Sequence, residues 1–145
     1  MANVETVSVR NDLAELPVVY ATLEAFCAGG GLPETVRRSL LLIIEELFSN
    51  TVSYGYANGQ ADRISVTASL GSDHVELTME DKAAPFDGSV APDGPDTQET
   101  VDLKAIGGLG LFLVHQLAEE VCYERIEDIN RITVLVSRAA ADTAD

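Results

Sequence analysis

The sequence predicts an α+β fold: a two-layer α/β sandwich whose mixed, largely antiparallel sheet carries its helices on one face. Stretches that alternate apolar and polar residues come in pairs joined by short turns, which favours antiparallel pairing. Three longer stretches repeat apolar residues at helical spacing, so each helix has one face that can cover a sheet. At 145 residues the chain is long enough for one sizeable core, and we expect a single domain over residues 1–145.

The first part of the chain predicts a strand followed by two helices. Residues 4–10 alternate in polarity, as in a half-buried edge strand. From Leu13 to about Ala28, apolar residues recur at helical spacing, and Asn11 or Asp12 can cap that helix. The glycines that follow end it. Six residues of this helix recur at that spacing: Leu13, Leu16, Val19, Tyr20, Leu23 and Phe26.

The longest helical pattern, residues 33–56, carries polar residues that a plain core helix does not need. Its predicted buried stripe consists of Val36, Leu40, Ile43, Ile44, Leu47 and Tyr54. At about 100° per residue, Asn50 falls on the edge of this stripe and Glu46 lies beside it one turn earlier, while Glu45 faces solvent. A polar group buried without partners costs on the order of 1–3 kcal/mol, so this pair requires an explanation.

The rest of the chain predicts two hairpins separated by a loop and a helix. Residues 63–70 and 74–79 form the first hairpin, and residues 121–126 and 131–137 form the second. Residues 83–106 contain three prolines and many acids, which is typical of a loop. The third helix begins at the glycines before residue 111 and runs to about residue 120. We expect the tail, residues 139–145, to be disordered.

The composition narrows the class of function. Twenty-four acidic against nine basic residues give a formal charge of −15, which argues against binding nucleic acid or an anionic membrane. The only two cysteines, Cys27 and Cys122, sit in apolar patterns and are predicted to be buried thiols. There is no apolar leader pattern, and the longest strongly apolar run is Leu40–Ile44, so we expect a cytoplasmic protein.

Three stretches carry candidate chemistry, and each has a plainer alternative. Glu46 and Asn50 suit a general base and a Mg²⁺-binding amide oxygen, or a surface acid beside an Asn that bonds a loop. Asp81, at a strand end, suits an acceptor for the amino group of a base, or a solvated loop acid. Residues 107–110, Gly-Gly-Leu-Gly, open a helix where backbone amides can approach phosphate, although this motif is weak alone.

Taken together and in this order, the three stretches resemble the GHKL superfamily of ATPases and kinases. The matching segments are EELFSNTVSYGY, EDKAAPFD and GGLGLFLVHQLAEEV. More narrowly, the chain is similar to the anti-sigma-factor serine/threonine kinases that partner STAS-domain antagonists. The resemblance covers nearly the whole chain and implies the Bergerat ATP-binding fold with a histidine-kinase-like ATPase domain.

The resemblance also implies roles for individual residues. Glu46 would be the base that takes the proton of a protein serine, and Asn50 would bind Mg²⁺. Asp81 would read the adenine amino group, with Thr133 completing the hydrogen bonds around the base. The phosphates of ATP would lie against Gly108, Leu109 and Gly110, and residues 87–106 would form the ATP lid.

Two positions depart from the family pattern. Ala83 stands where the first glycine box usually has glycine, and Lys104 is the nearest match to a lid arginine. Alanine is small enough to lie against adenine. Lysine can neutralise phosphate charge but lacks the bidentate geometry of arginine.

The function expected from the resemblance is that of an ATP- and Mg²⁺-dependent protein serine/threonine kinase in a partner-switching system. Such a protein phosphorylates a STAS-domain antagonist and binds a sigma factor or an equivalent regulator, so it acts in transcription regulation. It is expected to be a homodimer. The alternative is a nucleotide-gated binding protein that sequesters its partner without transferring phosphate.

Overall fold

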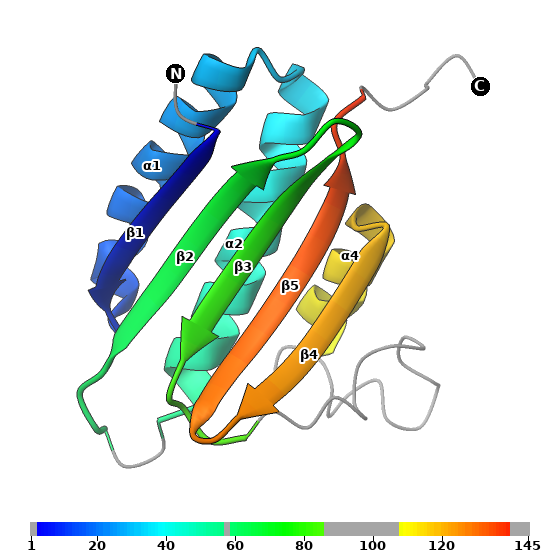
Figure 1. The fold of residues 1–145 in the computed structure, drawn as a ribbon. Coiled ribbons are helices and arrows are strands. Elements are labelled where there is room, and N and C mark those ends of the chain that lie inside the picture. Colours follow the sequence, from blue (N-terminus) through cyan, green and yellow to red (C-terminus); the bar gives the residue numbers. More distant parts are fainter. Residues whose placement is uncertain (1–2, 57–58, 86–107, 140–145) are drawn as a thin grey trace.

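The computed structural model describes residues 3–56, 59–85 and 108–139, which form one sheet and its covering helices (Figure 1). The elements follow one another in the predicted order. They are β1 (Val4–Arg10), a 3-10 turn (Leu13–Glu15), α1 (Leu16–Gly30), α2 (Glu34–Tyr54), β2 (Arg63–Leu70), β3 (His74–Asp81), α4 (Gly108–Leu117), β4 (Glu120–Ile126) and β5 (Ile129–Ser137). The predicted lid, residues 87–106, and residues 140–145 of the predicted tail lie outside the described residues.

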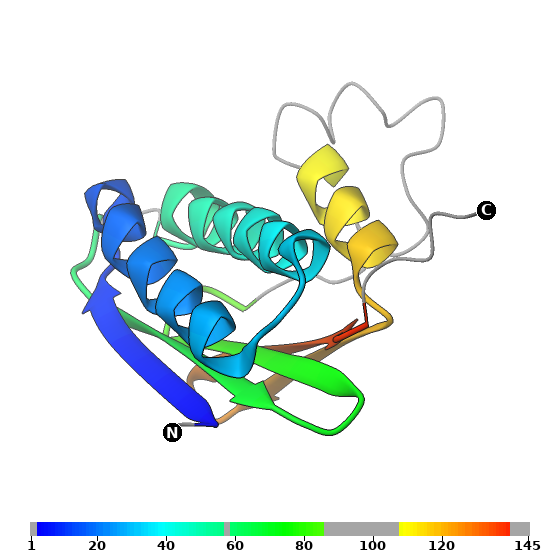
Figure 2. The same ribbon diagram turned by 90° about the horizontal axis from the view of Figure 1, so that it is seen from above.

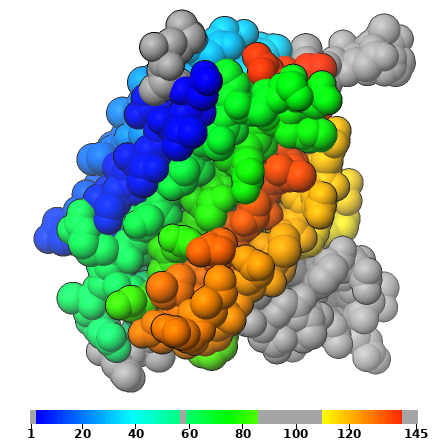
Figure 3. Space-filling model, viewed as in Figure 1, coloured from blue at the N-terminus to red at the C-terminus, as the bar shows by residue number. Residues whose placement is uncertain are grey.

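The five strands form an open sheet in the order β1-β2-β3-β5-β4. Every pair of described strands is antiparallel, so the sheet is purely antiparallel rather than mixed. The described helices α1, α2 and α4 all cover the same face (Figure 2). The opposite face of the sheet, which these helices leave uncovered, is turned toward the viewer in the space-filling view (Figure 3). The predicted α+β two-layer sandwich is confirmed.

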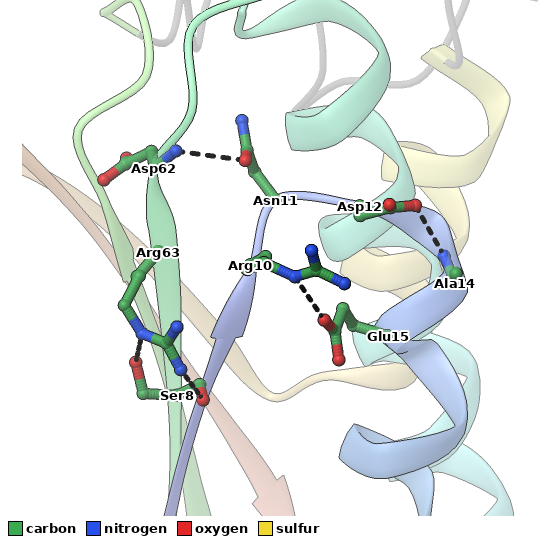
Figure 4. A network of polar contacts seen from close by, with 8 residues as sticks. All are labelled: Ser8, Arg10, Asn11, Asp12, Ala14, Glu15, Asp62 and Arg63. Carbon is green, nitrogen blue, oxygen red and sulfur yellow. Dashed lines mark hydrogen bonds and ion pairs between the residues drawn. The ribbon is translucent and has the colours of Figure 1, made fainter.

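Short polar contacts fix the entry to α1 (Figure 4). Asp12 caps the 3-10 turn by accepting a hydrogen bond from the Ala14 amide at 2.9 Å. The Asn11 Oδ1 accepts from the Asp62 amide at 3.1 Å, which ties this turn to the segment before β2. The predicted helix from Leu13 therefore starts with a 3-10 turn, in which Leu13 is 46% exposed, and α1 itself begins at Leu16.

The long helix α2 packs as the pattern predicts along most of its length. Five of the six predicted core residues are buried, and Glu45 is exposed as expected. Tyr54 is 52% exposed, so its predicted burial is wrong; it lies in the last turn, beside a cavity rather than over the sheet. Phe48, outside the predicted stripe, is fully buried. The buried face of α2 is therefore wider than the predicted stripe of residues.

The core lies between the helices and the inner face of the sheet. It includes Cys27 of α1, as predicted. Cys122 is exposed, so its predicted burial is wrong. β4 is an edge strand, and Cys122 is the residue paired with Thr133, on the face that the described helices leave uncovered. No helix in the described part of the chain is both long and apolar enough to cross a bilayer.

Candidate functional site

A cavity of about 530 Å³ opens where the end of α2 meets the ends of β3, β4 and β5. Asn50, Asp81 and Ala83, three of the predicted site residues, line it. The remaining lining residues are Leu47, Thr51, Tyr54, Gly55, Met79, Ala84, Pro85, Leu111, Tyr123, Glu124, Arg125, Asn130, Arg131 and Ile132. A cavity of this size, mostly apolar with a few polar groups, suits a small organic ligand.

Asp81 is the polar centre of the cavity. It ends β3, is only 5% exposed, and is the one buried charged residue in the described part of the chain. Its Oδ1 accepts hydrogen bonds from the Ala83 amide at 2.9 Å and from Asn130 Nδ2 at 3.0 Å. Both bonds use Oδ1, so within the described part of the chain Oδ2 is left to accept from a ligand.

The pKa of Asp81 is raised above its ordinary value. Burial is the largest cause, because a charged carboxylate loses hydration there, and the negative charge of Asp62 adds to it. The hydrogen bonds from Asn130 and the Ala83 amide act in the opposite direction, as does the positive charge of Arg125. The ionised form of Asp81 is therefore destabilised by burial and stabilised by the hydrogen-bond donors and the arginine beside it.

Asn130 holds this part of the cavity together and was not predicted from the sequence. It faces Asp81 directly across the β3–β5 pair. Besides Asp81, its Nδ2 donates to the carbonyls of Ala83 at 3.0 Å and Ala84 at 3.1 Å, and its Oδ1 accepts from Arg125 at 2.7 Å. The sequence places Asn130 near the start of the last strand. It does not show that Asn130 pairs with Asp81, because the two residues are 49 positions apart and the register between their strands cannot be read from a single sequence.

A second unpredicted network supports the end of β3 from the other side. The Asp62 carboxylate accepts from the Tyr56 hydroxyl at 2.6 Å and from the Lys82 amide at 2.9 Å. Burial would raise the pKa of Asp62, but these hydrogen bonds outweigh it and the pKa is lowered. Burial and the same bond raise the pKa of Tyr56. The segment after α2 is therefore fastened to the residue next to Asp81.

Asn50 lies half-buried on α2 at the edge of the cavity. Its Nδ2 is buried and has no hydrogen-bond partner among the residues that the structure describes. A carboxamide in this state fits a site completed by a ligand. Within the described ranges, no three His, Cys, Asp or Glu side chains gather as a metal cage. The amide oxygen of Asn50 is of the ligand type that Mg²⁺ prefers, so Asn50 would be the residue that holds such an ion.

Ala83 and Gly55 form the floor of the cavity by close contact. Ala83 is 5% exposed, and a Cβ placed on Gly55 would lie 2.6 Å from the Ala83 Cβ and 2.7 Å from the Thr51 carbonyl oxygen. The Ala84 amide also donates to the Gly55 carbonyl at 2.9 Å. The methyl group of Ala83 therefore occupies space that the glycine leaves open.

Glu46 lies outside the residues that line the cavity, against the first turn of α4. A Cβ placed on Gly110 would meet the Glu46 Oε1 atom and would lie 2.7 Å from Cδ. The Glu46 side chain is partly buried, and this burial, followed by the nearby charge of Glu45, raises its pKa. The structure thus brings Glu46 and Gly110, which belong to two of the predicted stretches, into contact.

The other predicted site residues are Gly108, Leu109, Lys104 and Thr133. Gly108 and Leu109 are the first two residues of α4, and Lys104 lies outside the described residues. Thr133 is not among the residues that line the cavity. It lies between the buried Ile132 and Val134, so strand alternation points it to the opposite face of the sheet. The β5 residue that contacts Asp81 is Asn130 instead.

Comparison with known proteins identifies similar chains. The family described as histidine kinase-like ATPase domain matches residues 9–136. The serine-protein kinase RsbW of Bacillus subtilis (strain 168) is 26% identical over 124 residues, which cover 83% of this chain and 76% of the relative. The RsbW of Bacillus velezensis is 27% identical over the same length and the same shares.

Among solved structures, a longer chain shares the fold. The crystal structure of the RsbU and RsbW domains of Rv1364c from Mycobacterium tuberculosis superposes with a TM-score of 0.63 at 17% identity. The match covers 96% of this chain and 34% of that longer chain.

Proposed function

The chain belongs to the histidine kinase-like ATPase domain family, the GHKL group that its motifs resemble, and from this premise we propose that it is an ATP-dependent protein serine/threonine kinase. Its substrate in this proposal is a STAS-domain antagonist in a partner-switching system. The observation that carries the proposal is that Asn50 and Asp81 line one cavity together with Leu111 of α4, while Glu46 lies against Gly110 in the first turn of the same helix. The similarity to proteins named serine-protein kinase, over about three quarters of their length, supports the choice of serine.

In this proposal the cavity holds the adenine end of ATP. The free oxygen of Asp81 accepts a hydrogen bond from the exocyclic amino group, and Ala83 lies against the ring. The Asn50 carboxamide binds the Mg²⁺ ion that accompanies the phosphates. The amides of Gly108 and Leu109 at the start of α4, together with Lys104, stabilise phosphate charge. This chain has few other cations for that task, because most of its described arginines bond within the protein.

ATP supplies the phosphoryl group, and the protein supplies a base and an orientation for the acceptor. The Glu46 carboxylate takes the proton of the serine hydroxyl as its oxygen forms the new bond to the γ-phosphorus. The bond from phosphorus to the β-phosphate oxygen breaks, and ADP leaves. Partial burial suits this role, because the raised pKa of Glu46 makes it a better proton acceptor than an exposed acid.

The regulatory part of the proposal rests on the resemblance of the motifs to the anti-sigma-factor kinases. We infer that the unmodified antagonist competes with a sigma factor, or an equivalent regulator, for this chain, which acts as a homodimer. Phosphorylation of the antagonist would then leave the regulator bound.

Two adjacent acids provide the test of the kinase proposal. The protein is incubated with labelled Mg-ATP and a cognate STAS-domain protein, and label on serine or threonine is measured. Replacing Glu46 with Ala should lower the transfer rate by about 10²-fold or more, while ATP affinity measured by calorimetry stays within a few-fold. Replacing Glu45, which faces solvent and is only the smaller cause of the raised Glu46 pKa, should lower the transfer rate far less and leave ATP affinity unchanged.

The outcomes separate the two candidate functions. ATP binding by the wild-type protein with no label on the partner would contradict the kinase and support nucleotide-gated sequestration. Equal losses of transfer in the Glu45 and Glu46 variants would contradict the role of Glu46 as the base.

A further inference from the structure

We propose that Gly110 is a positioning residue for Glu46: the side chain that it lacks is the space in which the Glu46 carboxylate lies. The inference rests on the proposed function only where it concerns catalysis. It gives Gly110 a role different from a close approach to phosphate, which is the role that the resemblance implies for the glycines at the start of α4.

The contact itself is specific to one side chain. All three of the nearest atoms that a Cβ on Gly110 would meet belong to Glu46: Oε1, then Cδ at 2.7 Å, then Cγ at 3.4 Å. The three successive atoms show that the end of the Glu46 side chain occupies the position that a Cβ of residue 110 would take. Any residue larger than glycine at position 110 has to displace the Glu46 carboxylate.

The backbone of α4 gives no other reason for glycine at this position. Gly110 is the third residue of a ten-residue helix, and its φ is not among the positive values found in the described chain. Alanine is better than glycine inside a helix, because glycine loses more backbone entropy on folding. The glycine therefore carries a helix-propensity cost that the contact with Glu46 explains.

Replacing Gly110 with alanine should affect folding and catalysis by Glu46 differently. The atoms that an alanine would meet are the far end of a flexible side chain, so the chain can fold by turning Glu46 away. A carboxylate that is turned away no longer lies where it meets the acceptor hydroxyl, and small displacements of a catalytic group cost large factors in rate. Gly110→Ala should therefore act on catalysis through Glu46 and leave nucleotide binding almost unchanged.

The test is a double-mutant cycle of Gly110→Ala and Glu46→Ala with two readouts. In transfer from Mg-ATP to the STAS-domain protein, Gly110→Ala should lower the saturated rate by about tenfold or more, with the Kd for ATP within about threefold. In the Glu46→Ala background, the same change should alter the rate by less than about twofold, because the residue through which it acts is gone. Gly29→Ala, in α1, is the matched control, because a Cβ there meets nothing within 4 Å.

The second readout needs neither ATP nor a partner. In the ligand-free protein, Gly110→Ala should raise Tm more in the Glu46→Ala background than in the wild type, because only the wild type has a carboxylate to displace. Equal Tm changes in both backgrounds would overturn the proposal, and so would a tenfold loss of ATP affinity with the saturated rate retained. If the wild type neither binds ATP nor transfers phosphate, the proposed function fails, while the Tm cycle still decides the role of Gly110.

Discussion

Asp81 and Asp62 lie at the same end of the sheet, yet their carboxylates have opposite pKa shifts. Asp81 is buried with only part of its hydrogen-bonding capacity used, so its pKa is raised. Asp62 receives the Tyr56 hydroxyl and backbone amides, so its pKa is lowered. The ionised Asp81 therefore lowers the free energy of unfolding of the ligand-free protein, whereas the ionised Asp62, with its hydrogen bonds, raises it.

This difference gives the first prediction. A raised pKa in the folded state favours folding fully only below the unfolded-state pKa, and this contribution is lost as pH rises through the folded pKa. Asp81→Asn, which is permanently neutral, should therefore raise Tm at pH 7 by roughly 2–4 °C and have little effect near pH 4. Calorimetric scans of the ligand-free protein at both pH values measure this. The same variant should lose ATP binding, because the amide places a donor beside the adenine amino group.

Asp62→Asn is the matched control with the opposite sign. A lowered pKa contributes stability above the unfolded-state pKa, and that contribution disappears as pH falls through the folded pKa. The Tm of Asp62→Asn should therefore fall at pH 7 and approach the wild type as the pH is lowered. If both variants shift Tm in the same direction at pH 7, the difference in environment between these two acids is contradicted.

At the scale of elements, α2 and the end of β3 meet through a pair of small residues. Gly55 has a φ of −89°, which any residue can adopt, so its glycine is explained by the Ala83 methyl group and not by the backbone. Gly55→Ala should lower the free energy of unfolding by about 1–3 kcal/mol through overpacking. Adding Ala83→Gly should recover part of that loss but not all, because the Thr51 carbonyl also crowds the new methyl group.

Urea denaturation of the two single variants and the double variant measures this coupling, which should be about 0.5–3 kcal/mol. Gly29→Ala controls for the helix-propensity effect. Strictly additive changes would mean that the two elements do not approach as closely as the structure places them.

The elements could be predicted because their signals are local. Alternation and helical spacing are properties of neighbouring residues, and they located the five strands and three α-helices of the described part of the chain to within a few residues. What failed depends on tertiary contacts: Tyr54 has helical spacing but lies past the sheet, and Cys122 has strand spacing but lies on an uncovered edge. Asn130 was missed for the same reason, because its contact with Asp81 follows from the pairing of two distant strands.

For the whole molecule, the dominant property is its charge. Of the nine basic residues, Arg10, Arg37, Arg38 and Arg131 form ion pairs with carboxylates. The acids outnumber the bases by fifteen, so most carboxylates have no opposite charge to balance them. Folding brings these like charges closer together than they are in the unfolded chain, which opposes the compact state.

The last prediction follows from this balance. Surface ion pairs contribute little, with a median of about 0–1 kcal/mol, so salt has little attraction to weaken here. It screens the excess repulsion instead, over a Debye length of about 30 Å at 0.01 M and about 10 Å at 0.1 M. Tm should therefore rise as NaCl increases from about 10 mM to about 200 mM, and KCl should give the same curve because screening depends on ionic strength alone. A Tm that falls with either salt would show that the ion pairs of the arginines outweigh the repulsion among the unpaired acids.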